Sequence, residues 1–245
     1  NKKDGLYCEQ YEHDACGVGM VVNIHGNKSH ELLDKALKVL ENMEHRGAET
    51  RDKTGDGAGV LIQIPHEFIL LQGIPVPEKG RYGTGMVFLP KDERKQRAIL
   101  EVMIEEIERE GLELMHLRSV PVNEDVPGAG AKEAQPDIKQ IFVTGISDDK
   151  VTQFERILYK IRKRIESRVS DDDFYICSLS NSIIIYKGML TSGQLRRFFP
   201  DLSNAYLTSG LALVHSRFST NTFPKWKLAQ PFRYLCHNGE INTVG

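Results

Sequence analysis

The chain has 245 residues, 40% of them hydrophobic, which is enough to bury an ordinary core in one large domain or two small ones. Its 32 lysines and arginines nearly balance 34 acidic residues, and the two signs are interspersed, so neither nucleic acid nor a membrane surface is expected as a partner. We favour one large domain. The four cysteines are irregularly spaced and do not indicate a disulfide framework, which favours a reduced, cytoplasmic protein.

The first predicted element is a strand over residues 17–24, in which every second side chain is apolar. This strand begins directly after Cys16, and the end of a strand is a rigid place for chemistry. An amphipathic helix follows, with Ser29 as its predicted cap and Gly47 as the residue that can stop it.

A glycine-rich segment at residues 53–59 leads directly into a predicted strand at residues 60–64. The segment lacks the residue order of a nucleotide-binding P-loop and has no helix immediately behind it. We therefore interpret it as a structural turn rather than as a phosphate site.

Strands and helices alternate through the middle of the chain. Strands are predicted at residues 81–89, 112–120 and 138–144, and a helix over about residues 92–110. Residues 121–136 are rich in proline, glycine and alanine, which predicts a surface loop.

The most regular helical pattern has apolar residues at spacings of four, three and four (Phe154, Leu158, Ile161, Ile165). Its other face is basic (Arg156, Lys160, Arg162, Lys163, Arg164, Arg168). No aromatic residues interleave with these charges, so we interpret them as a solvated face rather than a nucleic-acid patch.

The last third of the chain is rich in strands, predicted at residues 174–179, 182–186, 211–218 and 233–236, with short helical stretches between them. Several strands follow one another without a long helix between them. This order favours an α+β fold over a doubly wound parallel sheet.

Three polar clusters at predicted strand ends could carry chemistry. The first is Cys16, where Gly17 and Gly19 leave the backbone open to a substrate, although a lone cysteine is also a common buried hydrophobe. The second is Arg217, within His-Ser-Arg-Phe-Ser-Thr-Asn-Thr at residues 215–222. Its planar donors can bind both oxygens of a substrate carboxylate, and the alternative is a surface ion pair.

The third cluster is Cys-His-Asn-Gly-Glu at residues 236–240. The Asn238 side-chain amide and the N–H of Gly239 could together stabilise an oxyanion during acyl transfer. The alternative is an ordinary Asn-Gly hairpin turn.

A metal-binding module is a competing interpretation, because Cys8, His13 and Cys16 could form part of a ligand set that Cys236 and His237 complete. Structural zinc sites usually show two close-spaced pairs, and no residue separates Cys236 from His237. We therefore expect no metal here. A catalytically silent interaction domain is a further alternative.

Taken in chain order, four motifs resemble the amidotransferase domain of glutamate synthase. They are Cys-Gly-Val-Gly at residues 16–19, His-Arg-Gly at residues 45–47, the arginine motif at residues 215–222 and His-Asn-Gly-Glu-Ile-Asn-Thr at residues 237–243. The stretch between the second and third motifs is much longer than in the compact phosphoribosyl-pyrophosphate amidotransferases or glucosamine-phosphate synthases. The resemblance is therefore to the large subunit of glutamate synthase rather than to another class II amidotransferase.

The resemblance implies a four-layer αββα sandwich of the N-terminal-nucleophile hydrolase type and a glutaminase activity on L-glutamine. Cys16 matches the nucleophile that forms a γ-glutamyl thioester, with its own α-amino group as general base. Arg217 matches the residue that binds the α-carboxylate of glutamine, with Thr220 beside it. Asn238 and Gly239 match the oxyanion hole. Arg46 and Gly47 match the pocket wall behind the nucleophile.

The chain departs from the family pattern in two places. Fifteen residues precede Cys16, so residues 1–15 resemble a removable prosegment and residues 16–245 the amidotransferase domain. The family's acidic partner for the substrate amine lies downstream of Asn-Gly, so we expect a domain truncated at its C-terminus and inactive until Cys16 becomes N-terminal.

No cofactor is expected in this chain itself. In the parent enzyme, the resemblance implies that ammonia passes to the remaining synthase domains, which carry FMN and an iron-sulfur cluster. It also implies electrons from a small subunit or from ferredoxin.

Overall fold

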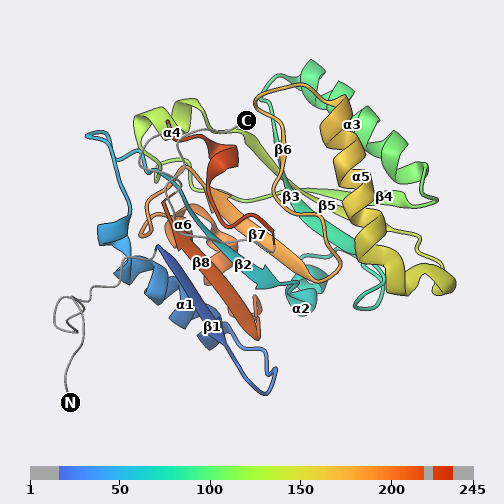
Figure 1. Ribbon diagram of the computed structural model, residues 1–245, viewed down its shortest axis with the longest axis horizontal. Helices are drawn as coiled ribbons and strands as arrows, with labels where there is room; N and C mark the ends of the chain where they lie inside the picture. The colour runs from blue at the N-terminus through green and yellow to red at the C-terminus, as the bar shows by residue number, and fades with distance from the viewer. Residues whose placement is uncertain (1–16, 218–222, 234–245) are drawn as a thin grey trace, which may run out of the picture.

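The computed structural model describes residues 17–217 and 223–233, and within them the strands form two four-stranded antiparallel sheets (Figure 1). The first sheet has the order β1 (Val18–Val22), β8 (Leu211–Ser216), β2 (Ala58–Gln63) and β7 (Ile183–Gly188). The second has the order β4 (Glu113–Ser119), β5 (Asp137–Thr144), β3 (Gly83–Leu89) and β6 (Tyr175–Ile176). The predicted α+β class is confirmed, whereas the finer four-layer stacking stays a prediction.

The helix α1 (His30–Asn42) lies against β1 and β8 of the first sheet (Figure 1). The Ser29 hydroxyl caps it by accepting a hydrogen bond from the N–H of Leu32 at 3.1 Å, as the sequence predicts. A short 3₁₀ turn, η2 (Glu44–Arg46), follows α1 and ends at Gly47. The helix thus delivers the His-Arg-Gly motif to one end of the first sheet.

The second sheet is covered by two long helices, α3 (Glu93–Glu108) and α5 (Phe154–Arg168), which pack side by side (Figure 1). The 3₁₀ turn η3 (Asp148–Gln153) leads into α5. The apolar residues that predicted α5 are buried in one cluster with side chains of β3 and β5. This packing is where most of the stability of such helices comes from.

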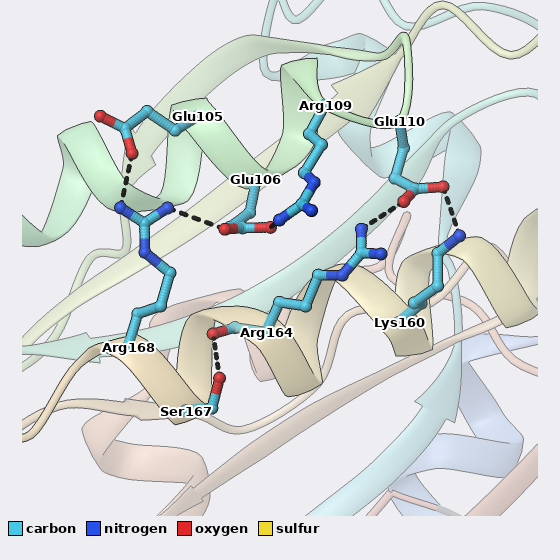
Figure 2. A network of polar contacts seen from close by, with 8 residues as sticks. All are labelled: Glu105, Glu106, Arg109, Glu110, Lys160, Arg164, Ser167 and Arg168. Carbon is cyan, nitrogen blue, oxygen red and sulfur yellow. Dashed lines mark hydrogen bonds and ion pairs between the residues drawn. The ribbon is translucent and has the colours of Figure 1, made fainter.

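The basic face of α5 is largely exposed, as the sequence predicts, but several of its charges also form ion pairs. Figure 2 shows Arg164 and Lys160 contacting Glu110, in the turn that follows α3, while Arg168 contacts Glu105 and Glu106 on α3. The sequence pattern reveals that this face is polar. It does not reveal that an acidic face of a second helix packs beside it.

Two short helices, α2 (His66–Leu71) and α4 (Ala129–Glu133), were not predicted from the sequence, whereas the short helical stretches of the last third were. The helix α2 has no side-chain cap and is too short to give a helical period. The predicted surface loop at residues 121–136 contains α4, in which Ala131 is fully buried. The last third contains α6 (Leu195–Phe198), η4 (Pro200–Ser203) and η5 (Trp226–Leu228).

Buried polar contacts tie the two sheets together. Arg118 on β4 donates two hydrogen bonds of 2.8 Å to the carboxylate of Asp201 in η4, and the hydroxyl of Tyr186 on β7 donates to the same carboxylate at 3.2 Å. Lys187 on β7 donates to the carbonyls of Lys227 and Ala229, at 2.9 and 2.6 Å. Burial lowers the pKa of Lys187 to about 7.

Among the described residues, no helix is both long and apolar enough to cross a bilayer. The strand predicted at residues 233–236 lies outside the described residues except for Arg233, whose φ of 51° is not that of a strand.

Candidate functional site

The pairing of β1 with β8 brings two of the sequence motifs together. The strands are antiparallel with Val18 opposite His215, and the N–H of Ser216 donates to the carbonyl of Gly17 at 2.7 Å. The start of β1 therefore lies beside the end of β8. Cys16 is the residue before Gly17 in the chain, and Arg217 is the residue after Ser216. Cys16 itself lies outside the described residues.

Arg217 is held in a backbone conformation that residues other than glycine rarely adopt. Its φ is 81°, in the left-handed region, and its N–H donates to the carbonyl of Gly57 at 2.7 Å. Such residues cost on the order of 1–3 kcal/mol and persist only when their surroundings over-determine them, which happens most often at functional sites. The sharp turn after β8 is therefore a fixed feature of the site.

The side chain of Arg217 forms an ion pair with Asp56, with 3.1 Å between Nε and Oδ2. The Asp56 side chain is 10% exposed and the Arg217 side chain 33% exposed. Burial raises the pKa of Asp56, and the positive charge of Arg217 only partly offsets that rise. The pair is thus not the surface ion pair that the sequence left open as an alternative.

The His-Arg-Gly motif packs against the same strand end. A Cβ atom added to Gly47 would lie 3.2 Å from the hydroxyl oxygen of Ser216, so the glycine allows a close approach. The Ser216 hydroxyl is also hydrogen-bonded to that of Ser192 at 2.8 Å. Arg46 is half-buried on the turn before Gly47. The structure therefore brings Gly47 and Arg217 to one end of the first sheet.

A cavity of about 220 Å³ opens beside this strand end, lined by Gly47 and Ser192 together with their neighbours (Glu44, Ala48, Glu49, Thr191). Both Gly47 and Ser192 contact Ser216, so the cavity adjoins the residue that precedes Arg217. A small polar molecule could enter it, and the two glutamates give it an acidic character.

The loop that carries Asp56 is itself anchored. Glu49 pairs with Gly55 across the loop, and the N–H of Asp56 donates to the carbonyl of Ala48 at 2.9 Å. A Cβ atom added to Gly55 would lie 2.0 Å from the carbonyl carbon of Leu190, so only glycine fits there. The turn predicted from the glycines is confirmed.

Four predicted site residues lie outside the described residues (Cys16, Thr220, Asn238, Gly239). Their assigned roles stay predictions. The proposed metal ligands of the competing interpretation lie there too. Among residues 17–217 and 223–233, no group of three or more His, Cys, Asp or Glu side chains could hold a metal ion.

Asp56 is the residue that sequence reasoning missed, because the glycines around it were interpreted only as a turn. The available signal was a carboxylate placed between two glycines directly before a buried strand. Cys177, by contrast, is fully enclosed in the core, and burial raises the pKa of its thiol to about 12. It is an inert structural cysteine.

Residues 16–245 match the family described as glutamine amidotransferases class-II. The chain therefore belongs to the class-II glutamine amidotransferase family, which confirms the family recognised from the four motifs.

Within that family, the chain is similar to glutamate synthases. The glutamate synthase (NADPH) large chain of Bacillus subtilis is 46% identical over 249 residues, which cover 99% of this chain and 16% of the relative. The glutamate synthase (NADH) of Saccharomyces cerevisiae is 44% identical over 257 residues, covering 99% and 12%. The ferredoxin-dependent glutamate synthase 2 of Synechocystis is 47% identical over 239 residues, covering 95% and 15%. The chain thus spans 12 to 16% of the length of these relatives.

Proposed function

We propose that the chain is the glutaminase part of a glutamate synthase, which hydrolyses L-glutamine to glutamate and ammonia once Cys16 is its N-terminal residue. The observation that carries this proposal is the β1–β8 pairing, in which the carbonyl of Gly17 accepts from the N–H of Ser216. It brings the residue that follows Cys16 beside the residue that precedes Arg217. A nucleophile and a carboxylate-binding arginine are the two groups that a glutamine amide hydrolase needs near each other.

In the proposed reaction, the Cys16 thiol attacks the side-chain amide carbon of glutamine. The thiol proton passes to the α-amino group of Cys16 and then to the leaving nitrogen, which departs as ammonia. The product is a γ-glutamyl thioester. Water then attacks the thioester carbon, which releases glutamate and restores the thiol. A free α-amino group has a pKa of about 7.7 to 8.0 and is partly unprotonated near neutral pH.

The proposal assigns a role to each remaining site residue. Arg217 binds the α-carboxylate of glutamine through two-pronged hydrogen bonds, with Thr220 beside it. The Asn238 amide and the Gly239 N–H stabilise the oxyanion as it forms. Arg46 and Gly47 form the wall behind the nucleophile, which agrees with the contact between Gly47 and Ser216.

Residues 1–15 are proposed to be a prosegment. While Cys16 is acylated by Ala15, its nitrogen is an amide and cannot act as a base near neutral pH. The family match begins at Cys16, which supports a mature domain with Cys16 as its first residue. The four-layer αββα arrangement belongs to the same proposal and would include residues outside those described.

The acceptor chemistry is proposed to reside outside this chain. An iron-sulfur cluster requires cysteine thiolates, and the cysteine among the described residues, Cys177, is buried with a raised pKa. The described residues therefore do not fit that cluster, and no step proposed here passes through it or through FMN. The relatives' names specify NADH, NADPH or ferredoxin, so the electron donor of the parent enzyme is one of these classes.

The test uses the processed enzyme, by which we mean the full natural chain that carries this sequence, beginning at Cys16. A glutamine analogue with an electrophilic diazoketone in place of the amide should alkylate Cys16, and excess L-glutamine should protect it. Peptide mass spectrometry locates the label, and Cys177 is the internal control because its thiol is buried. Labelling that ignores glutamine would favour the interaction-domain alternative.

A further inference from the structure

Two consecutive residues of the glycine-rich loop contact Arg217 at two points. The carbonyl of Gly57 accepts from the backbone N–H of Arg217 at 2.7 Å, and Oδ2 of Asp56 lies 3.1 Å from its side-chain Nε. The first contact is a hydrogen bond that fixes the backbone of the arginine, and the second is an ion pair, without hydrogen-bond geometry, at the inner end of its guanidinium.

We propose that Asp56 is a positioning residue that orients the guanidinium of Arg217 and thereby sets the affinity of the site for the α-carboxylate of the substrate. The inference deepens the proposed function and rests on it. Neither the motifs nor the family match assigns a role to Asp56.

The geometry of the guanidinium supports this role. The group is planar and carries five N–H donors in a rigid fork, so fixing the Nε edge also fixes the direction of the terminal Nη groups. Among the described residues, Arg217 forms an ion pair with Asp56, and it does so through Nε. The Nη groups are those that can bind a carboxylate with two parallel hydrogen bonds.

Burial of the pair strengthens the attraction that draws the guanidinium toward Asp56. With 10% of its side chain exposed, Asp56 has little water around it, and a carboxylate in such a place needs a hydrogen-bonding or ionic partner. A long, partly exposed arginine side chain loses orientation readily unless a fixed neighbour holds it. Asp56 is short and lies on an anchored loop, so it can serve as that neighbour.

The anchoring of the loop reaches elements distant in the sequence. The carboxylate of Asp52 accepts hydrogen bonds of 2.8 Å from both the N–H of Gly130 and the hydroxyl of Thr54. The side-chain amide of Gln194 donates to the carbonyls of Lys53 and Val126, at 3.0 and 3.1 Å. The loop is therefore tied to the segment around α4 and to the start of α6 by contacts that do not involve Arg217.

The experiment measures ammonia release from L-glutamine by four forms of the processed enzyme. They are the unmodified protein, Asp56→Asn, Arg217→Lys and the double variant. We expect Asp56→Asn to raise KM about tenfold while kcat changes less than about threefold. If Asp56 acts through Arg217, adding Asp56→Asn to Arg217→Lys should change KM less than about threefold.

Asp34→Asn is the matched control, because Asp34 forms an ion pair with Arg196 away from the site. It should leave KM and kcat unchanged. Asp56→Ser is a second variant, since its smaller side chain fits the same space if Asp56→Asn fails to fold. Thermal unfolding of every variant shows which of them are folded.

The outcomes distinguish failure of the inference about Asp56 from failure of the proposed function. If Arg217→Lys raises KM but folded Asp56→Asn or Asp56→Ser does not, the inference is overturned and the proposed function stands. The inference is also overturned if the two single effects multiply fully in the double variant, because Asp56 then contacts the substrate independently. If Arg217→Lys leaves KM unchanged in an active enzyme, the carboxylate role of Arg217 is wrong and the inference is overturned with it, while the glutaminase function stands. If the unmodified enzyme has no glutaminase activity, the proposed function fails and takes the inference with it.

Discussion

The ion pairs between α3 and α5 and the ion pair at the candidate site use the same chemical groups in different ways. Between the helices, Glu110 contacts both Lys160 and Arg164, and Arg168 contacts both Glu105 and Glu106 (Figure 2). These charges are shared among several partners on regular helices. They join α5 to α3 and to the turn that follows it, on the helices that cover the second sheet.

At the candidate site, one carboxylate contacts one arginine at its inner end. Arg217 sits on a strained backbone after β8, and a third of its side chain is exposed. Under the proposed function, the single charged pair on the strained turn after β8 serves recognition, whereas the shared network between the helices serves stability. Substitutions should separate the two roles.

The largest effect is expected at Asn238, which the account assigns to the site. In the processed enzyme, Asn238→Ala should lower kcat on the order of a hundredfold with little change in KM or melting temperature, because the amide acts only on the forming oxyanion. Steady-state ammonia release measures both constants. Asn204→Ala removes a turn asparagine whose side chain accepts from the N–H of Tyr206, and it should leave kcat unchanged. An unaltered kcat in Asn238→Ala would support the hairpin-turn alternative.

The next effect is expected at Arg217. Arg217→Lys should raise KM for glutamine about tenfold while kcat changes little, because a point charge replaces a two-pronged donor. Arg168→Lys makes the same chemical change between the helices and should alter neither constant. If kcat collapsed in Arg217→Lys while KM stayed constant, the carboxylate role would be wrong and the comparison would fail at its central residue.

A smaller effect, on stability alone, is expected between the helices. Glu106 is 3% exposed and lies 2.7 Å from Nη1 of Arg168. Glu106→Gln should lower the free energy of unfolding by about 1 kcal/mol, because a charge-assisted hydrogen bond is weakened, without changing KM or kcat. Glu105→Gln is the control, since Glu105 is 60% exposed and its loss should cost no more than about 0.5 kcal/mol. Denaturant titration measures both, and a change in KM would break the separation of roles.

The smallest effect concerns pH. The pKa of Asp56 is raised by burial, so its charge is present above the raised pKa and is lost on acidification at a higher pH than for an ordinary aspartate. Loss of that charge should release Arg217, and KM for glutamine should rise a few-fold as the pH is lowered through that raised pKa. In Asp56→Asn, KM should be high and nearly constant over the same range. A parallel rise in both proteins would assign the titration to another group.

The regular elements were predictable because their patterns are local. The alternation over residues 17–24 predicts β1, and Ser29 with the following leucines predicts α1 and its cap. The α+β class follows from strands that succeed one another without a long helix between them. The short helix α2 could not be predicted, since six residues without a cap give no period.

The site could be predicted only as separate motifs. The sequence indicated Arg217 and Gly47, and the structure brings both to Ser216. Asp56 was missed because an ion pair between residues 161 positions apart leaves no local pattern. The anchoring contacts of Asp52 and Gln194 are equally non-local, so the glycines predicted a turn but not the elements that hold it.

The central claim is that Cys16 acts through its own free α-amino group, and ammonia release from three proteins tests it most directly. The first is this chain, the second begins at Cys16, and the third begins at Cys16 and extends downstream to include the acidic residue that the resemblance implies. The account predicts efficient release from the third alone, and its loss in Cys16→Ser and Cys16→Ala. Robust release from the first protein, in which Ala15 still acylates Cys16, would contradict the claim.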